Sequence, residues 1–244
     1  MHGTDLATLL GDASESRQCP TPRGAIAASL FPPFAALQSE PRAVPLEPDA
    51  LVLLLGGAEA RALLPEAGSG SPRLYQLADP ASGIQAREGA VRVVATLRSG
   101  LPFASGSFDA VAVSPLVSTT LNPRALVREI ARVLKPGGRL FAKACCVSGA
   151  VAEDFAFTRV AADEGVTLLD CRGVVGLLEA SELCSVGLRG LVTVSLADPE
   201  DLRLLPNAEG FRAASNAFAA LGYDVGAVTL ALTSLEAVSR GEGA

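Results

Sequence analysis

The chain has 244 residues, 49% of them hydrophobic, and a formal net charge of −6 with a pI near 4.9. This length and apolar content suffice for the core of a full α/β domain, whereas the negative charge disfavours nucleic acid and anionic lipid as partners. The longest dense apolar run, residues 50–55, is far shorter than the roughly 20 residues that cross a bilayer. We therefore expect no nucleic-acid partner and no membrane span.

The cysteines and the single histidine limit which metal sites and nucleophile pairs the chain can form. We interpret the cysteines as small buried side chains in a reducing compartment, with a metal or redox site as the alternative, because no C-x-x-C occurs. The five are Cys19, Cys145, Cys146, Cys171 and Cys184. His2 is the only histidine, which disfavours Ser-His and Cys-His nucleophile pairs and His-ligated zinc. The start of the chain lacks a basic region followed by an apolar block, so we expect no secretory leader and an intracellular protein.

The first 48 residues are predicted to be an N-terminal extension, because prolines interrupt their short apolar stretches. The domain proper is predicted over residues 49–244. It opens with a strand at residues 50–55, followed by Gly56-Gly57 and a helix at 58–64. A glycine turn between a strand and a helix is where open α/β folds bind nucleotides, although LLGGAEA matches that pattern weakly.

The centre of the chain predicts a strand–helix–strand unit. Strands are expected at residues 73–77, 91–96 and 108–114. Asn122 and Pro123 are typical of a helix start, and the apolar stripe of the helix continues to Lys135. Pro136-Gly137-Gly138 predicts a turn before a strand at 139–143, which completes a right-handed βαβ crossover.

The second half alternates further helices and strands. Helices are expected at residues 151–164, 174–185 and 209–221, and strands at 166–169, 191–196 and 225–232. This alternation predicts an α/β fold with a doubly wound, mostly parallel sheet, covered on both faces and with the last strands at an edge.

Two sets of motifs resemble known families. LPF, SFDAVAVS and RVLKPGGRLF resemble the late motifs of class I S-adenosylmethionine (SAM) dependent methyltransferases. SFDAVAVSPLVSTTLN, EIARVLKPGGRLFAK and ELCSVGLRGLVTV resemble the N-terminal domain of anamorsin, a cytosolic iron–sulfur cluster assembly factor also called cytokine-induced apoptosis inhibitor. These pieces cover about a third of the chain.

The anamorsin resemblance implies a degenerate methyltransferase fold that does not bind SAM and is not an enzyme. It implies an interaction domain in iron–sulfur assembly that accepts electrons from a diflavin reductase, in the cytoplasm with a pool in the mitochondrial intermembrane space. The clusters of that family sit in a C-terminal cysteine-rich region whose motifs this sequence does not contain. We accordingly expect no cofactor and no metal. We also expect a monomer, because the predicted sheet and helix stripes take up the apolar residues without an obvious face left over.

The residues themselves also weigh against SAM. Leu54 and Leu55 offer no acceptor for an ammonium group before the glycine turn, and Ala58 to Ala60 replace its later glycines. Asp79 is a candidate ribose ligand, although a turn residue is the alternative interpretation. If SAM does bind, we expect it at Gly56, Gly57, Asp79 and Thr96. An active SAM-dependent methyltransferase with a divergent glycine loop is therefore the alternative function.

Three other features have simple interpretations. Asp109 is expected to be an exposed carboxylate at a strand start. The basic stripe Arg124, Arg128, Arg132 and Lys135 is expected to be the solvated face of a helix, or a face toward an acidic partner. Cys145 and Cys146 follow a predicted strand end, where a reactive thiol is the alternative to a buried one.

Overall fold

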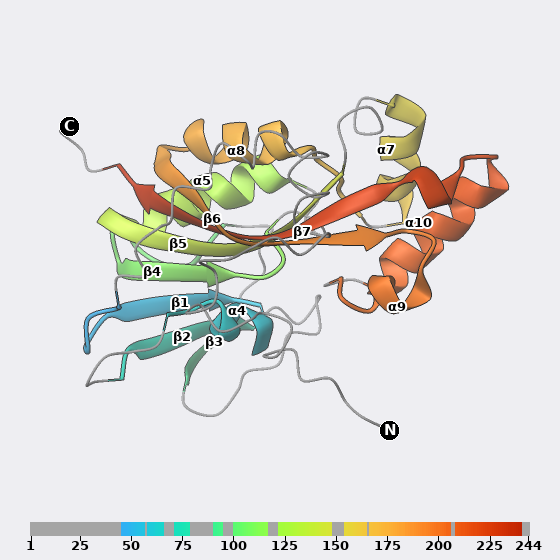
Figure 1. Ribbon diagram of the computed structural model, residues 1–244. Helices are drawn as coiled ribbons and strands as arrows, with labels where there is room; N and C mark the ends of the chain where they lie inside the picture. Colours follow the sequence, from blue (N-terminus) through green and yellow to red (C-terminus); the bar gives the residue numbers. More distant parts are fainter. Residues whose placement is uncertain are drawn as a thin grey trace, which may run out of the picture.

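The computed structural model describes residues 45–56, 58–65, 71–78, 90–94, 100–116, 122–147, 154–164, 166–205 and 208–240. Within them, seven strands form one sheet in the order β3-β2-β1-β4-β5-β7-β6 (Figure 1). The strands are β1 Leu51–Leu55, β2 Arg73–Ala78, β3 Ala90–Val94, β4 Phe108–Val113, β5 Leu134–Val147, β6 Leu183–Ser195 and β7 Thr229–Ser239. The helices are α4 Ala58–Ala62, α5 Pro123–Val133, α7 Phe155–Asp163, α8 Cys171–Glu179, α9 Pro199–Leu202, α10 Ala208–Ala220 and the 3₁₀ turn η2 Val225–Ala227.

The sheet is parallel except at one strand. β1 pairs in parallel with β2 and β4, β2 with β3, and β4 with β5. β7 runs antiparallel between β5 and β6, so β6 forms the edge. The predicted doubly wound, mostly parallel sheet with the last strands at an edge is therefore confirmed.

Helices cover both faces of the sheet. α5 and α8 lie on one face and α4 on the other, whereas α7, α9 and α10 gather beyond one end (Figure 1). The main core joins α5 and α8 to the sheet through fully buried side chains, among them Val127, Ile130 and Leu178. A smaller cluster under α4 contains Val52, Leu54 and Ala60. Most of the predicted N-terminal extension, residues 1–44, lies outside the described residues.

The end of the sheet near α7, α9 and α10 carries a second core. Phe157 of α7 stacks on Phe218 of α10, with ring centroids 3.8 Å apart, and Tyr223 packs edge-on against both rings. Cys145 and Leu232, which are paired residues of β5 and β7, form part of the same cluster. The long strands thus extend past β1 and β4 into a separately packed layer.

Helix α5 begins where the sequence predicts. The Asn122 side-chain oxygen accepts a hydrogen bond from the Ala125 N–H at 3.0 Å, and Pro123 occupies the first turn. Val127, Ile130 and Val133 form its buried face. The helix ends at Val133, two residues before Lys135, and the extended backbone of Leu134 leads directly into β5.

The LPF segment is held against α5 by an ion pair. Arg132 donates to the Glu129 carboxylate at 2.8 Å and also to the carbonyl oxygens of Leu101 and Phe103. Glu129 in turn accepts from the Leu101 N–H at 2.8 Å. Arg132 is therefore a structural clamp rather than part of a solvated stripe, which corrects the prediction at that position.

Glu129 should make stability sensitive to acid. The hydrogen bond from Arg132 outweighs the effect of burial and holds the pKa of Glu129 below its ordinary value. Its contribution is therefore present above the unfolded-state pKa of about 4.3 and is lost as the pH falls through the lower folded-state pKa. We expect Glu129→Gln to lower the unfolding free energy by roughly 1 kcal/mol at neutral pH.

Urea unfolding at neutral pH and at about pH 3 measures this effect, because the difference in unfolding free energy between wild type and variant should become smaller in acid. Glu200→Gln is the control, since Glu200 forms an exposed pair with Arg203. A gap for Glu129→Gln that persists unchanged in acid would contradict the prediction.

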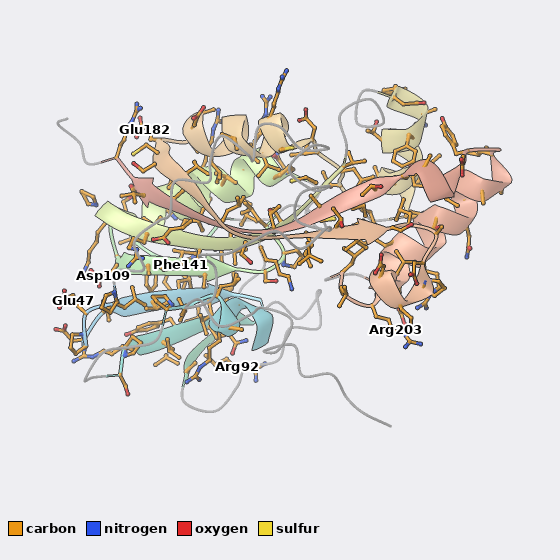
Figure 2. The ribbon with its side chains drawn as sticks, viewed as in Figure 1. Glu47, Arg92, Asp109, Phe141, Glu182 and Arg203 are labelled. Carbon is orange, nitrogen blue, oxygen red and sulfur yellow. The ribbon has the colours of Figure 1, made fainter. Side chains whose placement is uncertain are left out.

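The ion pair at the start of β4 also differs from the prediction. Asp109 accepts from Lys135 Nζ at 2.7 Å and from the Leu51 N–H at 2.9 Å. Burial alone would raise its pKa, but these two hydrogen bonds together leave the pKa of Asp109 below its ordinary value. Asp109, labelled in Figure 2, thus joins β4 to β1 and to β5 instead of standing as an isolated surface carboxylate.

The predicted Pro-Gly-Gly turn lies inside β5. The β4–β5 register moves from Phe108↔Leu134 to Ala110↔Arg139, so β5 carries a bulge between these two pairs. Gly137 has φ +75°, which suits glycine. The strand then continues to Val147, four residues beyond the predicted end.

The boundaries of the second half differ most from prediction. α8 spans Cys171–Glu179 instead of 174–185, because Glu182 takes φ +63° and the chain turns there into β6. β6 therefore starts at Leu183, well before the predicted residue 191. The predicted strand at 166–169 is reduced to a single bridge between Leu169 and Cys146, and residues 225–227 form η2 ahead of β7. α10, at Ala208–Ala220, lies within one residue of the predicted helix at 209–221 at both ends.

Candidate functional site

The sheet changes its winding direction between β1 and β4. From β1 the chain moves outward to β2 and β3, whereas β4 lies on the other side of β1 and leads to β5. Ligands of open α/β sheets bind outside the carboxyl ends of the strands at such a point. The turn after β1, opposite the end of β4, is therefore our candidate site.

Gly56 brings the ends of these two strands into contact. Its φ is +131°, and a Cβ built on it would overlap the Ser114 carbonyl oxygen and lie 3.4 Å from the Ala60 Cβ. The Ser114 N–H donates to the Leu55 carbonyl at 3.0 Å, so backbone pairing continues past β4. Only glycine suits both this φ and this close approach.

Gln76 supplies a polar group that the sequence analysis missed. It is paired with Leu54 across β2 and β1, is only 1% exposed, and donates from Nε2 to the Gly56 carbonyl at 3.0 Å. Leu54 itself is buried in the cluster under α4. A glutamine inside the apolar strand RLYQLA is the sequence signal that indicates this role.

The structure describes one of the four residues predicted to contact SAM. Gly56 lies at the candidate site, whereas Gly57, Asp79 and Thr96 fall outside the described residues. Asp79 follows the last residue of β2, and β2 is the direct neighbour of β1. Its predicted role as a ribose ligand stays a prediction.

The thiols after the predicted strand end are buried. Cys145 and Cys146 lie within β5 at 0% exposure, one in the second core and the other in the main core. Burial raises the pKa of Cys145 to about 12, and burial likewise raises the pKa of Cys146 well above its ordinary value. A thiol that stays protonated is a poor nucleophile, so these residues favour the buried interpretation.

The rate of alkylation should distinguish Cys145 and Cys146 from Cys184. At about pH 8 we expect iodoacetamide to leave Cys145 and Cys146 unmodified in the native protein, because almost no thiolate forms. Cys184, which is half-buried, should react faster. Peptide mass spectrometry measures the labelling, with urea-unfolded protein as the control in which all cysteines react. Rapid native labelling of either residue of the pair would contradict the assignment.

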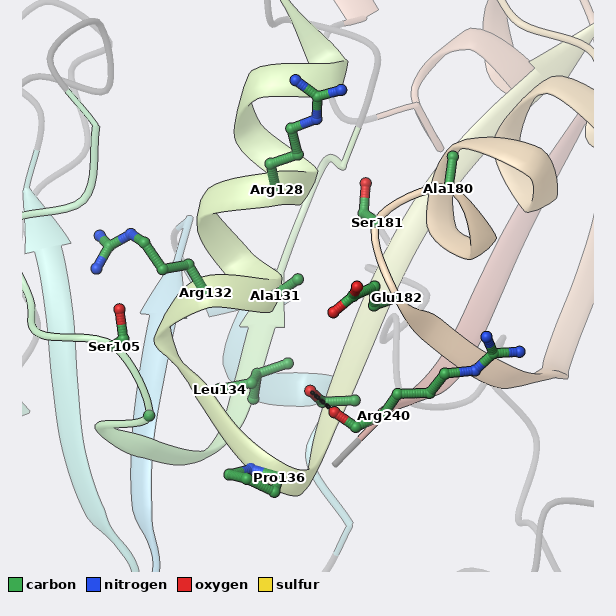
Figure 3. Close-up of a pocket in the computed structure, with 12 residues that line it drawn as sticks. Ser105, Arg128, Ala131, Arg132, Leu134, Pro136, Ala180, Ser181, Glu182 and Arg240 are labelled. Carbon is green, nitrogen blue, oxygen red and sulfur yellow. Dashed lines mark hydrogen bonds between the residues drawn. The ribbon is translucent and has the colours of Figure 1, made fainter. Parts of the chain in front are cut away.

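A groove lies at the opposite end of the strands. It measures about 560 Å³, and its lining includes Gly106 before β4, Pro136 near the start of β5 and Glu182 before β6. Figure 3 shows Arg128 and Arg132 on the α5 side and Glu182 on the other side. Because this groove faces the amino ends of the parallel strands, it is not where the fold places a nucleotide-like ligand.

No group of three or more His, Cys, Asp and Glu side chains among the described residues could hold a metal ion. No helix in the described part of the chain is long and apolar enough to span a membrane.

Comparison with known proteins agrees with this geometry. Residues 71–142 match the family model described as a methyltransferase domain. The YcgJ protein of Bacillus subtilis superposes with a TM-score of 0.52 at 17% identity, over 87% of this chain and 98% of that one. The fold is that of the class I methyltransferases. The [4+2]-cyclase SpnF shares it, with a TM-score of 0.51 at 15% identity over 87% and 80% of the two chains.

One sequence relative and one structure of similar fold are named as methyltransferases. A demethylmenaquinone methyltransferase of Mycolicibacterium vanbaalenii is 40% identical over 100 residues, which are 40% of this chain and 43% of that protein. The chain thus matches less than half the length of this relative. The phosphoethanolamine methyltransferase 2 of Haemonchus contortus, solved with S-adenosylhomocysteine, has a TM-score of 0.55 at 14% identity, over 82% and 51% of the two chains.

These findings correct one prediction. The expectation that the chain is not an enzyme is wrong, because the methyltransferase-domain match and the demethylmenaquinone methyltransferase relative point to an enzyme. The residues that led to the expectation, Leu54 and Leu55, are core side chains of β1. Their apolar character reflects burial on the two faces of the sheet, and Gln76 provides polarity from the neighbouring strand.

Proposed function

We propose that this chain is a SAM-dependent methyltransferase whose cofactor binds at the carboxyl ends of β1 and β4. The observation that carries the proposal is Gly56, which has a glycine-only conformation at the point where the sheet changes direction. Its lack of a Cβ lets the turn pack directly on the end of β4. The methyltransferase-domain match, which spans β2 to β5, supports the same reading.

Two of the described residues, Gly56 and Gln76, would form the part of the site at the turn after β1. Gly56 would shape the turn beside the cofactor by packing on the end of β4, and Gln76 would hold the carbonyl of that turn in place. Gly57, Asp79 and Thr96 are the further residues predicted to contact it. SAM supplies a methyl group on a positively charged sulfur. The chain's own task is to bind and orient that donor beside the acceptor.

The proposal covers the methyl donor. The demethylmenaquinone methyltransferase name belongs to a protein of which this chain matches less than half the length, and the acceptor in that name is said of that protein alone. The anamorsin resemblance and its diflavin reductase partner stay predictions of the sequence alone. The same holds for the monomeric state and the cytoplasmic location.

Calorimetric titration of the full chain with SAM tests the proposal. We expect saturable binding at micromolar affinity or tighter, and we expect S-adenosylhomocysteine to compete, since it lacks only the transferred methyl group. Such binding would also count against the anamorsin resemblance, which implies no SAM site. Absence of heat with either ligand, in protein shown to be folded, would overturn the proposal.

A further inference from the structure

Gln76 is a buried polar side chain on a strand whose other buried side chains are apolar. Leu74 and Leu77 of β2 are buried, and the cross-strand partners of Gln76 are Leu54 on β1 and the exposed Arg92 on β3. An amide removed from water is unfavourable unless it forms hydrogen bonds. The bond from Nε2 to the Gly56 carbonyl connects this side chain to the turn after β1.

The Gly56 carbonyl needs an external partner to hold it. Glycine has more conformational freedom than any other residue, and residues with a side chain rarely adopt a φ of +131°. Gly56 therefore has no side chain of its own to restrict the orientation of its carbonyl. Because the peptide unit is planar, fixing this carbonyl also fixes the plane in which the chain leaves β1. A donor on the adjacent strand, 3.0 Å away and shielded from water, provides that constraint.

We propose that Gln76 is a positioning residue for SAM, which holds the Gly56 peptide in the orientation that the cofactor requires. This inference rests on the proposed function. It assigns Gln76 no contact with the reacting atoms. The residue links the end of β2, where the predicted ribose ligand Asp79 follows, to the turn after β1.

Gln76→Met tests the inference by removing the donor while keeping a side chain of similar length. We expect SAM binding to weaken about tenfold in calorimetry. The matched control is Thr233→Val, which removes the buried hydrogen bonds of Thr233 to the Ala144 carbonyl and to the Cys146 side chain, but lies in β7 away from the turn. It should lose comparable stability in urea unfolding and keep the wild-type Kd for SAM.

Gln76→Glu adds a readout that a purely structural role would not produce. An ionised carboxylate cannot donate to the Gly56 carbonyl, whereas a protonated one can. Burial raises the pKa of a carboxyl group, and Arg92, the partner of residue 76 on β3, opposes this weakly because it is exposed to solvent. We expect the Kd of this variant for SAM to recover toward wild type as the pH falls from about 8 to about 5.5. Gln76→Met should show no such recovery relative to wild type.

The outcomes separate the two proposals. If wild type binds SAM and both Gln76 variants bind it equally well at every pH, the inference is overturned while the proposed function stands. If folded wild type does not bind SAM, the proposed function fails and the inference fails with it. If Gln76→Met does not fold, the pH profile of Gln76→Glu decides the matter.

Discussion

Gly56→Ala is expected to lower the free energy of unfolding by roughly 3 kcal/mol and to abolish SAM binding. Two effects combine at this position. The φ of +131° is unfavourable for any residue with a side chain, and the new Cβ would overlap the Ser114 carbonyl oxygen. Relief of that overlap requires β1 and β4 to move apart at the candidate site.

Two other glycines separate these effects. Gly137 has φ +75° with no atom within 4 Å of a built Cβ, so Gly137→Ala measures the conformational penalty alone. Gly176 lies in α8 with the same open surroundings, and Gly176→Ala should stabilise the protein by about 0.5–1 kcal/mol. Urea unfolding and SAM calorimetry measure all three variants. A Gly56→Ala protein as stable as Gly137→Ala would show that the strand ends are not in close contact.

Glu236→Ala is expected to be the most destabilising change in the sheet, at about 3–5 kcal/mol. The Glu236 carboxylate accepts from Arg139 Nε at 2.7 Å and lies 2.5 Å from its Nη2 atom, and the two side chains are 6% and 14% exposed. The Arg139 guanidinium also lies 4.8 Å from the centroid of the Phe141 ring. Removal of the carboxylate leaves a buried positive charge without this partner.

Arg203→Ala is the matched control for this prediction. Arg203 pairs with Glu200 at 2.7 Å, but both side chains are about 70% exposed (67% and 72%), so the loss should stay below about 1 kcal/mol. Figure 2 places Arg203 far from Phe141. The double variant Arg139→Met/Glu236→Leu should recover most of the stability, since an apolar pair needs no desolvation of charge. Equal losses from Glu236→Ala and Arg203→Ala would contradict this account.

Much of the sheet could be predicted because its signals are local. The valine-rich run at Phe108 and the Asn122-Pro123 helix start depend on neighbouring residues, and both elements lie where expected. The α8–β6 boundary could not be predicted in the same way. It depends on Glu182 adopting φ +63°, although no glycine stands at that position to indicate a turn. It also depends on pairing with β7, more than 50 residues later in the chain.

The candidate site was harder to predict for a related reason. Leu54 suggested that the turn had lost its polar group, whereas the structure places the Gln76 amide, from a different strand, against the Gly56 carbonyl. This contact depends on the pairing of β1 with β2, which the sequence of either strand alone does not reveal. Glu129 and Arg132 show the same limitation, because their partners lie in the LPF segment about 30 residues earlier in the chain.

The second core has a consequence for how this protein can diversify. Its aromatic stack of Phe157, Phe218 and Tyr223 shares no buried side chain with the contacts between Gly56, Ser114 and Ala60. Mutations in α7 and α10 can therefore remodel one flank of the molecule while the turn after β1 keeps its shape. An evolving lineage can in this way change the surface at that end of the sheet without disturbing the contacts of Gly56.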